Sequence, residues 1–120
     1  MRRILLIGAS NNPERYSNMA MYRLIENGYT VIPVNPFSEI ATKEKTLKKL
    51  RNITVDIEKA VIYIRPELLE NDIEDLIRIN PKEVIFNPGT ECPVMQRKLE
   101  KHNILVRNAC TLVLLSMGEF

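Results

Sequence analysis

The sequence predicts an α/β protein, namely a Rossmann-like three-layer sandwich with a mostly parallel five-stranded sheet. Short apolar runs alternate along the chain with stretches whose apolar residues recur at helical spacing. Strand–helix alternation at this spacing is typical of parallel strands that are covered by helices on both faces. The chain has 120 residues, which is the usual size of one domain. We therefore expect a single domain over residues 1–120.

The first strand and the first helix are predicted from an apolar run and the helical pattern that follows it. Arg3–Ile7 reads as a buried strand, because the apolar run ends at Gly8. The next stretch predicts a helix that is capped by Ser17 or Asn18 and runs to about Asn27. The residues expected to face inward from this helix are Met21, Leu24 and Ile25.

The second strand is predicted at Tyr29–Val34, which is rich in β-branched residues. It contains Pro33, which cannot donate a ladder hydrogen bond, so this residue is expected near the strand end or on an unpaired side. The polar stretch that follows is the hardest to assign. We expect a short helix at Thr42–Leu50 and a short extended piece at Arg51–Thr54.

The C-terminal half continues the same alternation. Its predicted strands are Ala60–Ile64, Glu83–Phe86 and Ile104–Val106, and its predicted helices are Glu67–Ile79 and Pro93–His102. The residues expected to face inward from these helices are Leu68, Leu69, Ile73, Leu76, Ile77, Val94, Met95 and Leu99. The final apolar segment, Thr111–Met117, fits either a strand or a short helix.

Composition and charge restrict the possible partners. There are 17 basic and 15 acidic residues, which gives a net charge of +2. This charge is too weak to predict a nucleic acid or an anionic membrane as partner, although it slightly favours a modest anionic ligand. The apolar run after Arg2-Arg3 is too short for a signal peptide, which needs roughly 7–15 apolar residues. No apolar run approaches the roughly 20 residues of a membrane span, so we expect a cytoplasmic protein.

The turn Gly8-Ala9-Ser10 lies between the first strand and the first helix, which is where such folds form phosphate sites. Gly8 permits a tight turn and lets a ligand approach the backbone. Backbone amides at the helix start would point at the phosphate, and the helix dipole would help to hold it. Additional donors are predicted from Ser10, Asn11, Asn12, Arg15, Ser17 and Asn18. The alternative is an ordinary strand-to-helix turn that happens to contain glycine.

Two features disfavour an ordinary dinucleotide site. The G-x-G-x-x-G fingerprint is incomplete, because Ser10 and Pro13 stand where that motif has glycines. The second strand ends in Asn35-Pro36, and no carboxylate follows until Glu39. Dinucleotide sites usually bind the ribose hydroxyls with an acid at this point. Its absence disfavours NAD and leaves room for a ribose-phosphorylated nucleotide such as coenzyme A or NADP.

Four segments and one further residue carry a resemblance to a known family. The segments are Gly8-Ala9-Ser10-Asn11-Asn12-Pro13, Gly28-Tyr29 with Val31–Pro36, Tyr63-Ile64-Arg65-Pro66 and Asn87-Pro88-Gly89, and the residue is Cys110. In these the chain resembles the stand-alone CoA-binding domain proteins. They are similar to the N-terminal domain of the succinyl-CoA synthetase α subunit and of ADP-forming acyl-CoA synthetases. The resemblance spans nearly the whole chain.

The resemblance implies how coenzyme A would lie. Its phosphates would rest on the Gly8–Ser10 turn and the helix start, and Arg65 would also meet them. Its adenosine would lie over Asn35-Pro36, and its pantetheine arm would pass Asn87-Pro88-Gly89. The residues implied to bind the cofactor are Gly8, Ala9, Ser10, Arg15, Tyr16, Ser17, Asn18, Asn35, Pro36, Arg65, Asn87, Pro88 and Gly89.

The chain also departs from the family pattern at three places. Members often have Lys or Arg where this chain has Phe37, at a position suited to the 3′-phosphate. Either Lys43 or Lys45 compensates, or the ligand lacks that phosphate. Asn108-Ala109-Cys110 replaces a frequent Asp-Arg-Cys, and Tyr16-Ser17-Asn18 replaces basic and small residues.

The remaining reactive side chains favour structural roles. Cys92 and Cys110 fit no metal motif and read as free thiols; Cys110 is either a small buried hydrophobe or a redox thiol. His102 lies at a predicted helix end, where such residues are common. We therefore predict no catalytic residue and no metal site. Synthetases of this group also need a phosphorylated histidine on a further domain and an ATP-grasp partner, for which the chain is too short.

Three functional hypotheses follow from the sequence. The leading one is a non-catalytic nucleotide-binding protein that binds coenzyme A or an acyl-CoA. It would take no nucleic acid or membrane partner, although a protein partner is possible. The second is an NAD(P)-binding enzyme or redox sensor on the same fold. The third is a Rossmann module that acts by protein contact alone.

Overall fold

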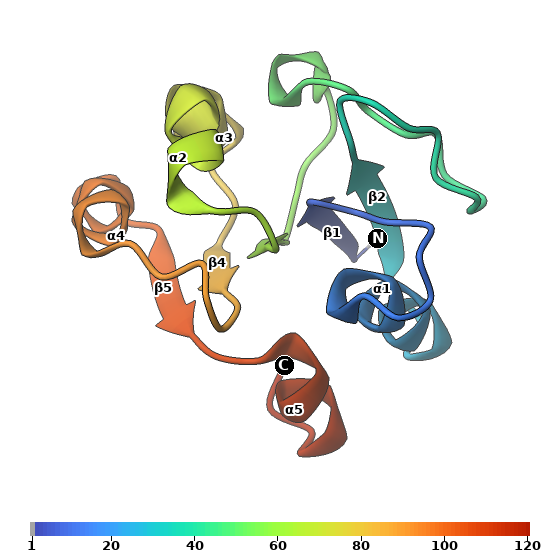
Figure 1. Cartoon of the computed structure of the whole chain (residues 1–120). Coiled ribbons are helices and arrows are strands. Elements are labelled where there is room, and N and C mark those ends of the chain that lie inside the picture. Colours follow the sequence, from blue (N-terminus) through green and yellow to red (C-terminus); the bar gives the residue numbers. More distant parts are fainter. Residues whose placement is uncertain (1) are drawn as a thin grey trace.

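The computed structural model describes residues 2–120 and contains one five-stranded sheet (Figure 1). The strands are β1 (Arg3–Ile7), β2 (Thr30–Val34), β3 (Lys59–Ile62), β4 (Glu83–Phe86) and β5 (Leu105–Asn108). The helices are α1 (Tyr16–Glu26), α2 (Pro66–Leu69), α3 (Ile73–Ile79), α4 (Pro93–Lys101) and α5 (Thr111–Ser116). Two 3-10 turns, η1 (Leu50–Asn52) and η2 (Glu70–Asp72), complete the set. The predicted fold class is confirmed.

All four strand pairings are parallel, in the order β2-β1-β3-β4-β5. The chain leaves β1 toward β2 on one side and then crosses to β3 on the other side. Strand order therefore reverses at β1. In open parallel sheets the loops diverge at such a point and leave a crevice beyond the carboxyl ends of the strands.

Side chains of β1 alternate between two cores, because successive residues of a strand point to opposite faces. Leu5 and Ile7 pack in the core that η1, α2, α3 and α4 cover. Ile4 and Leu6 pack in the core that α1 and α5 cover. The sheet is thus the middle of three layers, with α1 and α5 on one side and α2, α3 and α4 on the other (Figure 1). All four of these β1 residues are at most 2 % exposed.

Pro33 lies where the sequence predicts, next to the end of the edge strand β2. Its carbonyl accepts a hydrogen bond from the amide of Leu47 at 2.9 Å. Leu47 forms an isolated parallel bridge with Val34 on the side of β2 away from β1. The nitrogen and carbonyl of one strand residue point to the same side. The missing N–H of Pro33 therefore costs no bond to β1.

Several element assignments are wrong. The expected helix at Thr42–Leu50 is not present. This stretch contains bends, irregular backbone and the bridge residue Leu47, and its last residue, Leu50, begins η1. The expected extended piece at Arg51–Thr54 begins instead as the 3-10 turn η1. Leu50 is 1 % exposed. Burial of this leucine, which is a tertiary effect, anchors the turn where the local pattern predicts extended chain.

The predicted helix at Glu67–Ile79 is interrupted. Asp72 has φ −113° and ψ 1°, so the backbone leaves the helical region there and α3 starts anew. Leu68 is 51 % exposed, although the pattern predicts that it faces inward, whereas Leu69, Ile73 and Leu76 are buried. Short polar side chains such as that of Asp72 favour helix starts over helix interiors.

Other boundaries and orientations differ in detail. The first helix begins at Tyr16 and is preceded by Arg15 in extended conformation, so Ser17 and Asn18 lie inside it and are buried. Ile25 is 40 % exposed and Val94 is 65 % exposed, although both were expected to face inward. The third strand ends at Ile62, the fifth extends to Asn108, and the final apolar segment is the short helix α5.

Candidate functional site

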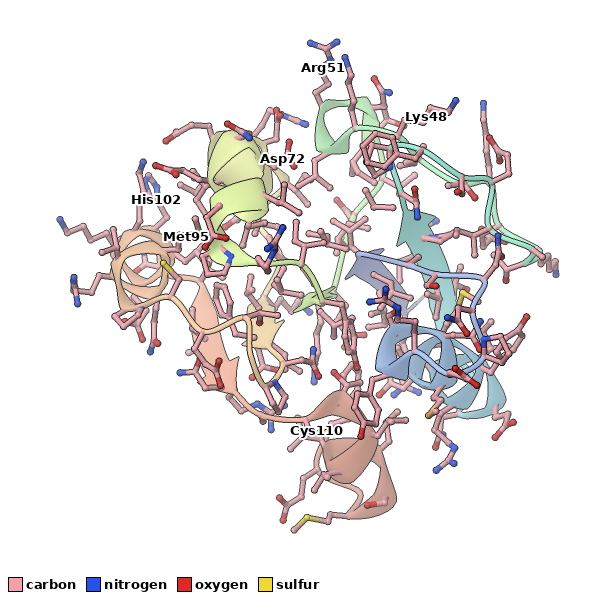
Figure 2. The ribbon with its side chains drawn as sticks, viewed as in Figure 1. Lys48, Arg51, Asp72, Met95, His102 and Cys110 are labelled. Atoms are coloured by element: carbon pink, nitrogen blue, oxygen red, sulfur yellow. The ribbon has the colours of Figure 1, made fainter. Side chains whose placement is uncertain are left out.

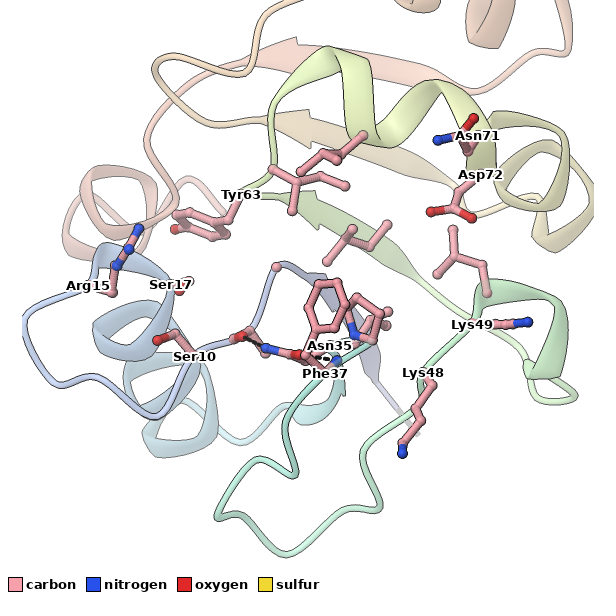
Figure 3. A pocket seen from close by; sticks show the side chains of 18 of the residues that line it. Ser10, Arg15, Ser17, Asn35, Phe37, Lys48, Lys49, Tyr63, Asn71 and Asp72 are labelled. Carbon is pink, nitrogen blue, oxygen red and sulfur yellow. Dashed lines mark hydrogen bonds between the residues drawn. The ribbon is translucent and has the colours of Figure 1, made fainter.

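A cavity of about 940 Å³ opens beyond the carboxyl ends of β1 and β2, at the point where strand order reverses (Figure 3). The Gly8–Ser10 turn and the start of α1 form one side of its lining. The end of β2 and the segment Lys48–Arg51 form another side. The third side is closed by the two residues that follow β3, Tyr63 and Ile64, and by residues of α2, η2 and α3. The position is the one that parallel α/β sheets use for ligands.

Gly8 is required by the packing of the chain against itself. Its φ is +98°, a conformation that L side chains rarely adopt. A Cβ atom at this position would lie 2.8 Å from Cγ2 of Ile64 and 3.0 Å from the carbonyl carbon of Tyr63. The amides of Gly8 and Ala9 both donate to the carbonyl of Val34, at 3.2 and 3.1 Å. These two amides are thus engaged by the protein, and the turn shapes the cavity without presenting them to a ligand.

The start of α1 supplies the free donors. Arg15 precedes the helix, and its carbonyl accepts from the amides of Asn18 and Met19 at 3.1 and 3.2 Å. The amides of Tyr16 and Ser17, the first two helical residues, find no acceptor within residues 2–120. Both residues line the cavity, and so does Arg15. Two unsatisfied amides, the positive end of a helix and a guanidinium therefore meet at this wall.

The asparagines near the turn serve mainly to hold the loop. The side chain of Asn18 is buried and donates from Nδ2 to the carbonyl of Ser10 at 2.9 Å. Asn11 donates to the carbonyl of Glu39 at 2.7 Å and accepts from the amide of Ala41 at 2.8 Å. These hydrogen bonds fix the turn against α1 and the segment after β2. Donation from these side chains to a phosphate stays a prediction.

Asn35 has a similar anchoring role at the end of β2 (Figure 3). Its Nδ2 donates to the carbonyl of Ala9 at 2.9 Å, and its Oδ1 accepts from the amides of Phe37 and Ser38 at 2.8 and 2.9 Å. The side chain ties the end of β2 to the glycine turn. Asn35 and Pro36 line the cavity, as the sequence predicts.

The structure does not bring every predicted residue to the cavity. Those that line it are Gly8, Ala9, Ser10, Asn12, Arg15, Tyr16, Ser17, Asn35 and Pro36. Arg65 is exposed at the start of α2, outside the lining. Asn87, Pro88 and Gly89 also lie outside it. Asn87 is buried, donates to the carbonyl of Ile62 at 3.1 Å and accepts from the amide of Thr111 at 2.8 Å. This side chain joins the ends of β3 and β4 to α5.

Sequence reasoning missed the basic and aromatic part of the lining. Lys48, Lys49 and Arg51 border the cavity, whereas Lys43 and Lys45 do not. Phe37 also lines it, with 91 % of its surface exposed. A signal was present in the sequence: Leu47 and Leu50 flank the two lysines, and such apolar residues in a polar segment indicate that the backbone there is anchored.

The third wall carries acidic groups. Asp72 and Asp75 line the cavity from η2 and α3. Burial raises the pKa of Asp72, and the charge of Asp75 raises it further. The carboxylate of Asp75 pairs with Arg78 at 3.7 Å. The cavity is therefore cationic near α1 and near the lysines, and acidic near α3.

Tyr63 lines the cavity close to its α1 side. Burial raises the pKa of Tyr63 to about 12; the neighbouring Thr111 hydroxyl opposes this shift, and the Cys110 thiol adds to it. The hydroxyls of Tyr63 and Thr111 are both buried, and neither reaches hydrogen-bond geometry with a partner in the described chain. The phenol is thus held neutral and serves as packing surface.

The other reactive side chains lie outside the cavity lining. Cys92 precedes α4 and Cys110 precedes α5, and both are free and half-buried. His102 follows the last residue of α4 and is exposed. Within residues 2–120, His, Cys, Asp and Glu side chains form no group of three that could hold a metal ion. None of the helices in that range has the length and apolarity to cross a bilayer.

Several families of ligand-binding proteins share this fold, and comparison with known families shows to which of them the chain belongs. A family model described as a CoA binding domain matches residues 2–116. The chain belongs to this CoA-binding domain family. The match covers nearly all of the described structure, including every segment around the cavity, and it confirms the resemblance seen in the sequence.

Individual relatives of this CoA-binding domain are similar over different lengths. The uncharacterized protein YneT of Bacillus subtilis is 32 % identical over 76 residues, which are 63 % of this chain and 56 % of the relative. The alignment thus spans little more than half of that protein. A crystal structure of an uncharacterized protein is 31 % identical, with a TM-score of 0.92 over 100 % of this chain and 98 % of the other.

Two further solved structures extend the comparison. A hypothetical protein from Pyrococcus horikoshii OT3 is 32 % identical, with a TM-score of 0.87 over 95 % of this chain and 81 % of the other. The dinucleotide-forming acetyl-coenzyme A synthetase 1 of Ca. Korarchaeum cryptofilum has a TM-score of 0.72 over 89 % of this chain and 25 % of its own. At 18 % identity, this last likeness shows the fold alone.

Proposed function

We propose that this CoA-binding domain protein binds coenzyme A in the cavity, with the diphosphate at the start of α1, and performs no covalent chemistry on it. The observation that carries the proposal is the pair of unpartnered amides of Tyr16 and Ser17, two residues that line the cavity at the start of α1. Backbone amides at a helix start bind phosphate by direct donation and through the helix dipole. The guanidinium of Arg15 adds a full charge at the same wall.

The end of β2 favours coenzyme A over NAD. A dinucleotide site needs a carboxylate here to accept from the ribose hydroxyls. The side chain at this point is Asn35, and its oxygen already accepts two backbone amides. The proposal that the protein is non-catalytic rests on the groups at the cavity. The phenol of Tyr63 is held neutral by burial, and the two thiols and the imidazole lie elsewhere.

The proposal is tested by deleting a single amide donor. Tyr16 is the first residue of α1, a position at which helices accept proline. Arg15 has φ −83° and ψ 139°, which is compatible with a following proline. Tyr16→Pro therefore removes one N–H while preserving the helix. Tyr16→Ala is the matched control, because it removes the same side chain and keeps the N–H.

Isothermal titration should show that the wild type binds coenzyme A. Tyr16→Pro should bind it about tenfold more weakly than Tyr16→Ala, because it loses one hydrogen bond to a charged group. Circular dichroism verifies that both variants are folded. Equal affinities of the two variants would place the phosphates elsewhere. Tighter binding of NAD or NADP than of coenzyme A by the wild type would overturn the ligand assignment. Consumption of acetyl-CoA during incubation, followed by chromatography, would overturn the non-catalytic role.

A further inference from the structure

Two segments of opposite charge border the cavity. The first, residues 43–51, is called the basic half below. It contains one acid, Glu44, and five cations, which are Lys43, Lys45, Lys48, Lys49 and Arg51. All five cations are exposed, and none forms an ion pair within the described chain. The basic half therefore presents uncompensated positive charge to solvent.

The second segment, residues 67–75, is called the acidic half. It contains no cation and five carboxylates, which are Glu67, Glu70, Asp72, Glu74 and Asp75. Two of the five are paired, one with Lys98 at 2.9 Å and one with Arg78 at 3.7 Å. Glu67, Glu70 and Asp72 form no ion pair within residues 2–120, and the first two are exposed. The acidic half therefore keeps uncompensated negative charge.

The two halves are neighbours on one face of the molecule. Residues of both line the same cavity, and Arg78 of α3 donates to the carbonyl of Leu50 in η1 at 3.3 Å. Lys48 and Arg51 lie on one side of this face and Asp72 on the other (Figure 2). The surface around the cavity mouth is thus divided into a positive and a negative part.

Exposed apolar side chains accompany the charges on this face. Phe37 and Leu68 both line the cavity, and they are 91 % and 51 % exposed (Figure 3 shows Phe37). The backbone of Phe37 is fixed, because its amide donates to Oδ1 of Asn35 at 2.8 Å. Apolar side chains near the centre and charged side chains around them are the usual arrangement of a protein–protein interface.

The division of charge determines which kind of partner fits. A nucleic acid, an anionic membrane or a uniformly acidic protein would be attracted by the basic half and repelled by the acidic half. A uniformly basic partner would meet the reverse. A fitting partner needs both charges in the exchanged arrangement. A second copy of this chain meets that requirement, because a two-fold axis through the cavity mouth exchanges the two halves.

We propose that this face binds the same face of a second copy, with the basic half of each copy on the acidic half of the other. Both contacts are attractive, and Phe37 and Leu68 of the two copies lie close to the axis. Each copy then covers the mouth of the other's cavity. The inference goes beyond the proposed function and does not depend on it, because the two copies associate without a nucleotide.

Sedimentation velocity of the whole chain, without nucleotide, measures this association. The wild type should form a dimer whose population rises with protein concentration. Raising the NaCl concentration from about 0.05 M to about 0.5 M should weaken the dimer by about tenfold, because salt screens exposed charges. A wild type that stays monomeric at low salt would overturn the inference, and so would a dimer whose stability does not depend on salt.

Two charge-reversal variants test which surfaces meet. Lys48→Glu/Lys49→Glu changes the basic half, and Glu67→Lys/Glu70→Lys changes the acidic half. All four side chains are exposed and unpaired within the described chain, so both variants should fold, which circular dichroism verifies. Each variant alone should dimerise about tenfold more weakly than the wild type. An equal mixture of the two should form a heterodimer, because substituted positions of opposite charge then face each other.

The matched control is Arg97→Glu/Lys101→Glu, which makes the same change of net charge at exposed residues of α4 outside the cavity lining. It should dimerise like the wild type. Equal weakening by this control and by Lys48→Glu/Lys49→Glu would overturn the inference, as would a mixture of the two reversal variants without heterodimer. A monomeric wild type that binds poly-L-glutamate would assign the basic half to an acidic protein and overturn self-association. Failure to bind coenzyme A would overturn the proposed function and leave the dimer intact.

Discussion

Gly8→Ala should be far more destabilising than alanine at the other glycines with positive φ. The added methyl group would be forced into a backbone conformation with φ +98°, which costs about 1–2 kcal/mol. It would also lie 2.8 Å from Ile64 and 3.0–3.1 Å from the backbone of Tyr63. Because the backbone atoms belong to the segment that continues β3, they cannot move without disturbing the sheet. Overpacking of this kind costs about 1–3 kcal/mol more.

The expected loss is thus about 2–5 kcal/mol out of a total of about 5–15 kcal/mol for a domain. For a chain of this size that corresponds to a fall of about 8–20 °C in Tm. The controls are Gly28→Ala and Gly89→Ala, with φ +87° and +92° and no atom within 4 Å of the added Cβ. They should lose only the conformational part, about 1–2 kcal/mol. Urea denaturation followed by circular dichroism measures all three. Equal destabilisation of the three variants would refute the reasoning, since it would mean that the approach of β1 to β3 adds nothing.

Two further predictions concern groups outside the cavity lining. Burial opposes ionisation of Glu83, but hydrogen bonds and charge from Arg107 and Lys59 outweigh it and lower the pKa of Glu83 below its usual 4.5. A lowered pKa gives stability that is present above the unfolded value and is lost as pH falls through the folded value. Glu83→Gln should therefore lower the free energy of unfolding by about 3 kcal/mol at pH 7. The difference in unfolding free energy between this variant and the wild type should shrink below pH 4.5. A difference that does not change with pH would contradict the ion-pair explanation. Asn87→Ala should cost about 1–3 kcal/mol in urea denaturation, because it leaves the buried amide of Thr111 unpaired, while the carbonyl of Ile62 keeps its bond from the backbone amide of residue 87. The Asn87→Ala variant should bind coenzyme A in titration with the same affinity as the wild type. A clear loss of affinity would indicate that Asn87 contacts the ligand.

The regular parts of the fold could be predicted because they depend on short-range pattern. Glu83–Phe86 is a strand with the predicted bounds, since an unbroken apolar run between polar residues fits a central parallel strand. Gly8 and Asn35 were recognised for a similar reason, because each stands at a strand end where this fold places its ligand. Their detailed roles were not predictable. The glycine is needed against Tyr63 and Ile64, and these residues are brought to it only by the crossover from β2 to β3.

The sequence by itself determined the alternating α/β architecture, the family and the glycine turn at the cavity. Each of these depends on local spacing of apolar residues or on a short motif. The tertiary structure decided which polar side chains line the cavity and which hold the scaffold. Asn87 and Arg65 follow strands as a binding residue would, yet they lie outside the cavity. Lys48 and Lys49 belong to a segment without regular structure, and they reach the cavity because Leu47 pairs with β2 and Leu50 is buried. Contacts between residues distant in the chain set these positions, and local pattern does not record them.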